Sequence, residues 1–168
     1  MPNAIAIFDP KSSCNSSGIS GSVKFHSCSE HKNTLITFTL SGFKPHATHG
    51  IHIHKNGITS LEKACDSTCD HYNPHGNLHG SMSLYGNSRH VGDLINNIKC
   101  DENGNFNYTY EDDVVKLESP HSVIGRSIVI HGGVDDLGIY RDFDKGSATT
   151  GNAGSRIACS VIGVVEDC

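Results

Sequence analysis

No apolar run of membrane-spanning length and no block of lysines or arginines occurs in this sequence. A membrane-spanning helix needs about 20 mainly apolar residues, and nucleic acids or anionic membrane surfaces favour clustered positive charge. The formal net charge is instead −5. We therefore expect neither a nucleic acid nor a membrane as partner. The length of 168 residues predicts one domain over residues 1–168 with a core of its own.

Helical periodicity is also missing, because no long window repeats apolar residues at helical spacing. Eighteen glycines favour strands and loops over helices. The N-terminus has neither a basic segment nor a long apolar segment, so it predicts a first strand in place of a signal peptide. A cytoplasmic location follows as an expectation, and no internal repeat is present.

The cysteines contain no C-x-x-C pair, so a zinc ribbon or a thioredoxin-type motif is not supported. Their number is odd, so they cannot all pair within one chain, and a reducing compartment keeps most of them as free thiols. The seven cysteines are at positions 14, 28, 65, 69, 100, 159 and 168.

Short alternating segments predict an all-β fold of eight strands. Residues 101–104 give a turn signal that predicts a hairpin between the fifth and sixth segments. Two long polar loops, from residue 55 to about 91 and from 132 to 156, are expected to be functional. The fold expected is an antiparallel Greek-key barrel or sandwich. The predicted strands are 4–8, 19–25, 34–40, one following Pro45, 93–99, 105–110, 127–131 and 157–165.

The segment 48–54 reads Thr-His-Gly-Ile-His-Ile-His. A strand turns alternate side chains to opposite faces, so Ile51 and Ile53 are expected in the core and His52 and His54 on the other face, about 7 Å apart. That spacing suits two imidazoles on one metal ion. The alternative is a strand with a polar, solvated face, and the metal site is favoured because more histidines follow.

Those further candidates lie in the first long loop and just beyond it. His90 and Asp93 are three residues apart with a glycine between them, so both can turn toward one ion. Imidazole with carboxylate suits zinc, whereas imidazoles without thiolate also suit copper. Solvated surface histidines are the alternative. The candidates are His71, His75, His79, His90 and Asp93.

Four segments resemble signatures of the copper/zinc superoxide dismutase family: residues 50–54, Cys65 with residues 71–74, residues 89–94 and residues 151–159. The resemblance runs in the same order over nearly the whole chain. It implies an eight-stranded antiparallel Greek-key sandwich or barrel of immunoglobulin-like architecture with two long functional loops.

The resemblance also implies the site, with one copper and one zinc ion per subunit. Copper is held by His52, His54, His71 and His131, and zinc by His71, His79, His90 and Asp93. Asp135 then links a copper ligand to a zinc ligand, Thr150 lines the substrate channel, and His71 and Arg156 are catalytic.

The implied reaction converts two superoxide anions and two protons to dioxygen and hydrogen peroxide. Copper is alternately reduced and reoxidised, and zinc is its structural partner through the bridging His71. Gly132-Gly133 and Thr149 stand where the family often has lysines, so we expect weaker steering of superoxide. Two alternatives are a copper chaperone-like protein and a catalytically inactive dismutase-fold binding module. All seven implied ligands are present, which favours the enzyme.

The remaining implications concern cysteines, histidines and partners. The resemblance implies a disulfide between Cys65 and Cys159, for which Cys69 is a competitor, and a homodimer through Val123, Ile124, Gly125 and the C-terminal strand. It allows a copper-loading chaperone as a further partner. The histidine at 49 is expected to be structural, and those at 26, 31, 46 and 121 to be ordinary surface or turn residues.

Overall fold

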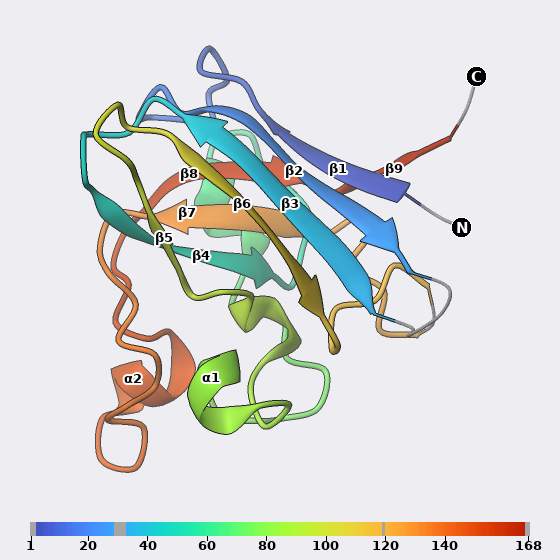
Figure 1. Ribbon diagram of the computed structural model, residues 1–168, viewed down its shortest axis with the longest axis vertical. Helices are drawn as coiled ribbons and strands as arrows, with labels where there is room; N and C mark the ends of the chain where they lie inside the picture. Colours follow the sequence, from blue (N-terminus) through green and yellow to red (C-terminus); the bar gives the residue numbers. More distant parts are fainter. Residues whose placement is uncertain (1–2, 29–32, 119, 167–168) are drawn as a thin grey trace.

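The computed structural model describes residues 3–28, 33–118 and 120–166. Nine strands are found in these residues, together with two short helices and two 3-10 turns (Figure 1). The helices are α1 (Met82–Tyr85) and α2 (Lys145–Thr149), and the 3-10 turns are η1 (Ala64–Thr68) and η2 (Val91–Asp93). The strands are β1 (Asn3–Phe8), β2 (Ser20–Ser27), β3 (Thr34–Ser41), β4 (Thr48–His54), β5 (Asn97–Lys99), β6 (Phe106–Asp112), β7 (Ser127–His131), β8 (Arg156–Val161) and β9 (Gly163–Val165).

Two antiparallel sheets enclose the core. One sheet has the strand order β6-β3-β2-β1-β9, and the other has the order β5-β4-β7-β8. Alternate residues of the facing strands are buried between the sheets, because strand side chains alternate between the two faces. The core side chains Phe25, Phe38, Ile51, Ile53, Ile128 and Ile130 are at most 1 % exposed. The antiparallel all-β prediction is therefore confirmed, in its sandwich form.

The predicted hairpin between residues 93–99 and 105–110 is wrong. Strand β5 pairs with β4, whereas β6 pairs with β3 in the other sheet. The turn itself exists, since Asp101 Oδ1 accepts hydrogen bonds from the backbone of Asn103 and Asn105, both at 2.8 Å. It connects the two sheets, and the local signal does not say which strands it joins.

The fifth predicted strand is also shorter than expected. Leu94 and Asn96 have left-handed backbone angles, with φ of 49° and 60°. That conformation is incompatible with an extended strand. Residues 91–93 form η2, which turns the Asp93 side chain inward, and only Asn97–Lys99 remains as a strand.

The closing segment 157–165 forms two strands in place of one. Strand β8 pairs with β7, while β9 pairs with β1 in the opposite sheet. The break falls at Ile162, which is fully buried and whose N–H bonds to the carbonyl of Arg126 at 2.8 Å. The chain therefore crosses between the sheets here, which explains the ninth strand.

The two long loops lie against each other at one end of the sandwich, where Figure 1 shows α1 beside α2. Their contacts are specific: Tyr85 Oη donates to the carbonyl of Gly138 at 3.0 Å, and the Arg141 guanidinium lies 3.4 Å above the Tyr85 ring. Among the described residues no helix combines the length and apolarity needed to cross a bilayer. The single domain over residues 1–168 stays a prediction.

Candidate metal centre

Strands β4 and β7 carry three of the site histidines on one face. The register pairs His52 with Val129 and Ile51 with Ile130, so the isoleucines face the core and the histidines face away from it, as the alternation predicted. An irregularity in the register between β7 and β8 falls at Ile130/His131. All the site histidines of β4 and β7 are nevertheless at most 4 % exposed, because the long loops cover that face.

Four imidazoles meet over this face. His52, His54, His71 and His131 each offer a ring nitrogen, and these nitrogens all lie within 4.8 Å of one another. The Nε2 atoms of His54 and His131 are 3.3 Å apart, and the ring centroids of His52 and His71 are 3.9 Å apart. We call this set the four-histidine group. Four nitrogens without a thiolate are a donor set that suits copper.

A second group forms around Asp93 and contains His71, His79 and His90, again with ligand atoms within 4.8 Å of one another. Asp93 Oδ1 lies 2.8 Å from Nδ1 of His79 and 3.1 Å from Nδ1 of both His71 and His90. We call this the Asp93 group. Three imidazoles and one carboxylate are a donor set that suits tetrahedral zinc.

His71 belongs to both groups and presents a different nitrogen to each. Its Nδ1 faces Asp93, while its Nε2 is buried and has no hydrogen-bond partner. Nδ1 of His52 is likewise buried without a partner. Buried polar atoms are nearly always satisfied, so these two orphaned nitrogens fit a cation held by the four-histidine group. The residues present therefore fit copper on one side of the His71 ring and zinc on the other.

A single carboxylate connects the two groups from behind. Asp135 Oδ2 lies 2.5 Å from Nε2 of His52, and its Oδ1 lies 2.9 Å from Nε2 of His79. Asn96 Nδ2 donates to Oδ2 at 3.3 Å, and the backbone N–H of Leu137 donates to Oδ1 at 2.6 Å. These contacts fix the tautomer and orientation of both imidazoles, which is what outer partners of metal ligands do.

The buried histidines differ in their affinity for protons. Burial is the largest influence on the four-histidine group: it lowers the pKa of His52 and His131 to about 4, that of His71 to about 3, and that of His54 well below its usual range. The neutral ring that results is the form that binds metals. Burial also opposes protonation of His79, but hydrogen bonds to Asp135 and Asp93 outweigh it and raise its pKa to about 9.

The two carboxylates remain ionised. Burial alone raises the pKa of Asp93 and of Asp135, but hydrogen bonds from the histidines outweigh this effect, so both pKa values are lowered. The charge on each carboxylate is therefore available to offset the positive charge of a bound cation.

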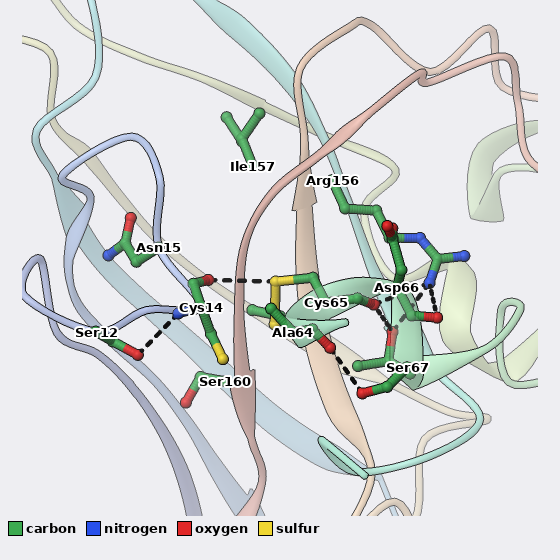
Figure 2. Close-up of a disulfide and its surroundings, with 12 residues drawn as sticks. Ser12, Cys14, Asn15, Ala64, Cys65, Asp66, Ser67, Arg156, Ile157 and Ser160 are labelled. Atoms are coloured by element: carbon green, nitrogen blue, oxygen red, sulfur yellow. Dashed lines mark hydrogen bonds between the residues drawn. A yellow bond between two sulfur atoms is a disulfide. The ribbon is translucent and has the colours of Figure 1, made fainter. Parts of the chain in front are cut away.

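A cavity of about 300 Å³ opens above the four-histidine group. Its lining includes His54, His71, His131 and Thr150, with Arg156 from the start of β8. The Arg156 Nη1 donates to the carbonyl of Cys65 at 2.9 Å, and Figure 2 shows the guanidinium reaching toward the η1 turn. The first long loop thus holds the Arg156 guanidinium at the wall of the cavity.

A disulfide between Cys65 and Cys159 ties that loop to β8, with 5.6 Å between the two Cα atoms (Figure 2). The predicted pairing is confirmed. Cys14, Cys28, Cys69 and Cys100 are free thiols, and Cys168 lies outside the described residues. The carbonyl of Cys14 accepts a hydrogen bond from the Cys159 N–H at 3.0 Å, so the loop between β1 and β2 covers the bridge.

The other described histidines lie outside both groups. His49 Nδ1 is 2.9 Å from the carbonyl of His131, which gives it the structural place that was expected. The His75 ring is 4.8 Å from that of His121, His26 and His46 are exposed, and position 31 lies outside the described residues.

Sequence reasoning missed the backbone and amide partners of the ligands. His54 Nδ1 lies 2.6 Å from the carbonyl of Cys69, and His90 Nε2 lies 3.0 Å from that of Asn77. Carbonyl groups leave no signal in a sequence. Asn96 and Asn97 lie just beyond Asp93 and bond to Asp135, but only the tertiary fold reveals these contacts.

Comparison with known proteins gives a consistent result. The sequence profile of the family "Copper/zinc superoxide dismutase (SODC)" matches residues 19–162. The Superoxide dismutase [Cu-Zn] of Saccharomyces cerevisiae is 43 % identical over 149 residues, covering 89 % of this chain and 92 % of that protein. That of Cordyceps militaris is 47 % identical over 148 residues, covering 88 % and 92 %.

A solved structure shows the same fold. The crystal structure of the clock protein EA4 superposes with a TM-score of 0.82 at 34 % identity, covering 97 % of this chain and 94 % of that chain. The profile match spans most of the chain, and the two named relatives exceed 40 % identity over most of their length. The chain belongs to the copper/zinc superoxide dismutase family.

Proposed function

We propose that this chain converts superoxide to dioxygen and hydrogen peroxide at the four-histidine group, with the Asp93 group as the structural partner. The observation that carries the proposal is the place of His71, whose Nε2 belongs to one group and whose Nδ1 faces the other. Family membership supports the activity, because the fungal relatives are named as copper-zinc superoxide dismutases.

The proposed ligands follow the two groups. His52, His54, His71 and His131 hold copper, and His71, His79, His90 and Asp93 hold zinc. Copper supplies the reversible one-electron change that the reaction needs, whereas zinc has a filled d shell and serves only to organise the site. Asp135 orients one imidazole of each group through its two oxygens.

Two side chains handle substrate and proton. The Arg156 guanidinium is always charged and offers a planar set of donors, so it binds and orients a small anion in the cavity. His71 lines the same cavity, and its Nε2, when it is not engaged by a metal ion, would hold a proton for the nascent peroxide. Its buried ring favours the neutral form, so that a proton held there is readily given up.

The test combines elemental analysis with a superoxide consumption assay on the native chain and on His131→Ala. The variant is expected to lose copper and at least about 100-fold in activity while it keeps zinc, because three of the four copper ligands do not hold the ion as tightly. His75→Ala is the matched control, since His75 is exposed and outside both groups. Full activity with zinc alone contradicts the proposal.

We further infer a homodimer built on Val123, Ile124, Gly125 and the C-terminal strand. Val164 and Val165 of β9 are 50 % and 44 % exposed, which supports an apolar partner surface there. Val123 is fully buried within the chain, so its neighbours Ile124 and Gly125 supply the contacts. Light scattering on the native chain and on Val164→Lys tests this: a dimer that the substitution leaves intact contradicts the proposed surface.

We infer a cytoplasmic location from the cysteines. Four of the described cysteines remain free thiols, of which Cys69 is exposed. A reducing compartment preserves such thiols, whereas secreted proteins usually pair theirs. Cell fractionation with an antibody against the chain tests this, and recovery from the medium contradicts it.

A further inference from the structure

Asp70 is the only carboxylate among the described residues that line the cavity above the four-histidine group. It directly precedes His71 and shares the cavity with His54, His131 and Arg156. The residue is exposed, and its carboxylate is one of those counted in the formal net charge of the chain. A negative charge therefore stands at the entrance of a site whose proposed substrate is itself an anion.

The backbone around Asp70 is held in place by the end of β4. The Lys55 N–H donates to the Asp70 carbonyl at 2.8 Å, and His54 Nδ1 lies 2.6 Å from the carbonyl of the preceding Cys69. An isolated β-bridge also joins His54 to His71. The backbone position of Asp70 is thus held by Lys55 and by the contacts of His54 with its two neighbours, Cys69 and His71.

The Asp70 carboxylate is not committed to a structural role. Among the described residues none donates a hydrogen bond to it or forms an ion pair with it. The site carboxylates Asp93 and Asp135 differ, because both are buried and bonded to imidazoles. No ion pair among the described residues therefore engages the Asp70 carboxylate, which lines the same cavity as Arg156.

A second groove meets the cavity at the same residue. It has a volume of about 760 Å³, and both spaces are lined by Asp70, His71 and Thr150. Its lining also includes the cations Lys55, Arg126 and Lys145. The Arg126 guanidinium is stacked 3.5 Å from the Tyr72 ring and bonds to backbone carbonyls, whereas Lys145 is exposed. The groove therefore offers an anion the exposed cation Lys145 as well as the carboxylate of Asp70.

We propose that Asp70 is a specificity-determining residue that slows the entry of small anions into the cavity and limits the rate of the dismutase reaction. The proposal rests on the proposed function for its choice of superoxide as the anion and for copper at the four-histidine group. Charges within a few ångströms of a narrow cavity change association rates of charged ligands strongly at low ionic strength and weakly at high ionic strength. Asp70 opposes the attraction of Arg156, and Lys145 favours it.

The first test measures kcat/KM for superoxide by pulse radiolysis on enzyme loaded with copper and zinc, across a range of ionic strength. Asp70→Asn removes the charge and keeps the shape, so it is expected to raise kcat/KM about three- to tenfold at low ionic strength and to steepen the salt dependence. Asp70→Ser is a second neutral variant, and its kcat/KM is expected to increase in the same way as that of Asp70→Asn. Asp70→Glu keeps the charge and is expected to match the native chain, while Lys145→Met lowers kcat/KM.

Glu62→Gln is the matched control. Glu62 is exposed on the same loop, borders neither the cavity nor the groove, and changes the net charge by the same amount. An unchanged kcat/KM is expected for this variant. If Glu62→Gln and Asp70→Asn have equal effects, the net charge of the protein explains them and the proposal is overturned.

The second test uses the azide anion as probe and measures its dissociation constant from the absorption change of the copper(II) protein. Asp70→Asn is expected to bind azide tighter by about the same factor as its gain in kcat/KM, and Asp70→Glu is not. Lack of superoxide consumption overturns the proposed function but leaves this measurement intact. An azide affinity within twofold of the native value in both neutral variants overturns the role of Asp70.

Discussion

The Nε2 atoms of His54 and His131 lie 3.3 Å apart, although the two residues are separated by 77 positions in the sequence. Both rings are buried, and burial lowers the pKa of both. Two neutral imidazoles can share at most one proton at this point, and each has its other nitrogen against a backbone carbonyl, of Cys69 and of Gly154. The fold thus holds the lone pairs of the two Nε2 atoms close together, which costs free energy because they repel each other. A cation bound between them offsets this repulsion.

The first prediction concerns Asp135. Replacement by asparagine keeps the shape but removes the charge that orients His52 and His79, so metal affinity is expected to fall about 10- to 100-fold. The measurement is competition with a chelator for zinc and copper. Asp142→Asn is the control, because Asp142 is exposed on the same loop. Equal metal affinities in the native chain and Asp135→Asn are incompatible with the linking role.

The second prediction concerns the disulfide. The bridge joins residues 94 positions apart, and closing a loop of that size stabilises a fold by about 4–5 kcal/mol on the entropic model. Cys65→Ser is expected to lower the free energy of unfolding by up to that amount. It also frees the loop whose carbonyl binds Arg156, so activity should fall. Urea denaturation measures the first effect, and Cys28→Ser, away from the bridge, should leave both quantities unchanged.

Thiol counting on the metal-loaded protein, unfolded under non-reducing conditions, checks the same bridge. The chain has seven cysteines and two of them are paired, so five thiols are expected. A count of four or fewer reveals a second bridge and contradicts this assignment.

The third prediction concerns pH. The folded pKa values of His52, His71 and His131 lie below the ordinary value of 6.5, at about 4, about 3 and about 4. Their contribution to stability is therefore present above pH 6.5 and is lost as the pH falls through those values. As the pH is lowered from 6.5 to 4, the free energy of unfolding of the metal-free protein should decrease by roughly 2 kcal/mol or more. The urea midpoint, which measures this change, should fall with it.

His79 acts in the opposite direction. Its folded pKa is raised to about 9, so its contribution is present below pH 6.5 and is lost as the pH rises through 9. Stability of the metal-free protein should therefore decline on both sides of neutrality. The same curve is expected for His75→Ala, whose ring is exposed. A flat urea midpoint from pH 6.5 to 4 contradicts the assignment.

The fourth prediction concerns Arg156. Arg156→Gln is expected to lower kcat/KM for superoxide by roughly tenfold or more, because the cavity loses its fixed cation. Arg156→Lys retains the charge without the planar donors and should keep part of the rate. Identical rates for Arg156→Gln and Arg156→Lys would show that the charge of residue 156 has no part in substrate binding.

The fifth prediction extends to the wild-type chain. Gly132-Gly133 and Thr149 stand where the family resemblance leads us to expect lysines, and Asp70 adds a carboxylate to the lining of the cavity. The rate of the native chain should therefore depend less on ionic strength than that of a lysine-rimmed relative. Parallel salt titrations of the two enzymes make the comparison, and equally steep slopes contradict it.

Local periodicity made much of the site predictable. Residues 48–54 alternate isoleucine and histidine, and a period of two assigns each to its face without knowledge of the rest of the fold. Residues 127–131 were predicted as an apolar strand that ends on a histidine, and they form β7 with those bounds. The place of His131 beside His52 and His54 was implied by the family resemblance, and it depends on the direct pairing of β4 with β7, which the local patterns do not specify.

Tertiary features were not predictable in this way. The turn at residues 101–104 has strong local chemistry, yet it joins strands of different sheets. Ile162 continues an apolar run, yet the chain changes sheets there because its side chain fills the core. Asp70 has no local pattern at all, and its place at the cavity follows from hydrogen bonds to the end of β4.

The most direct test of the shared His71 ring is a crystal structure of the metal-loaded protein with anomalous scattering recorded at the copper and zinc edges. Two ions are expected on opposite sides of the His71 ring. Copper should lie at Nε2 with His52, His54 and His131, and zinc at Nδ1 with His79, His90 and Asp93. A single ion, two ions of one element in fully loaded protein, or a His71 ring that contacts only one ion would contradict it.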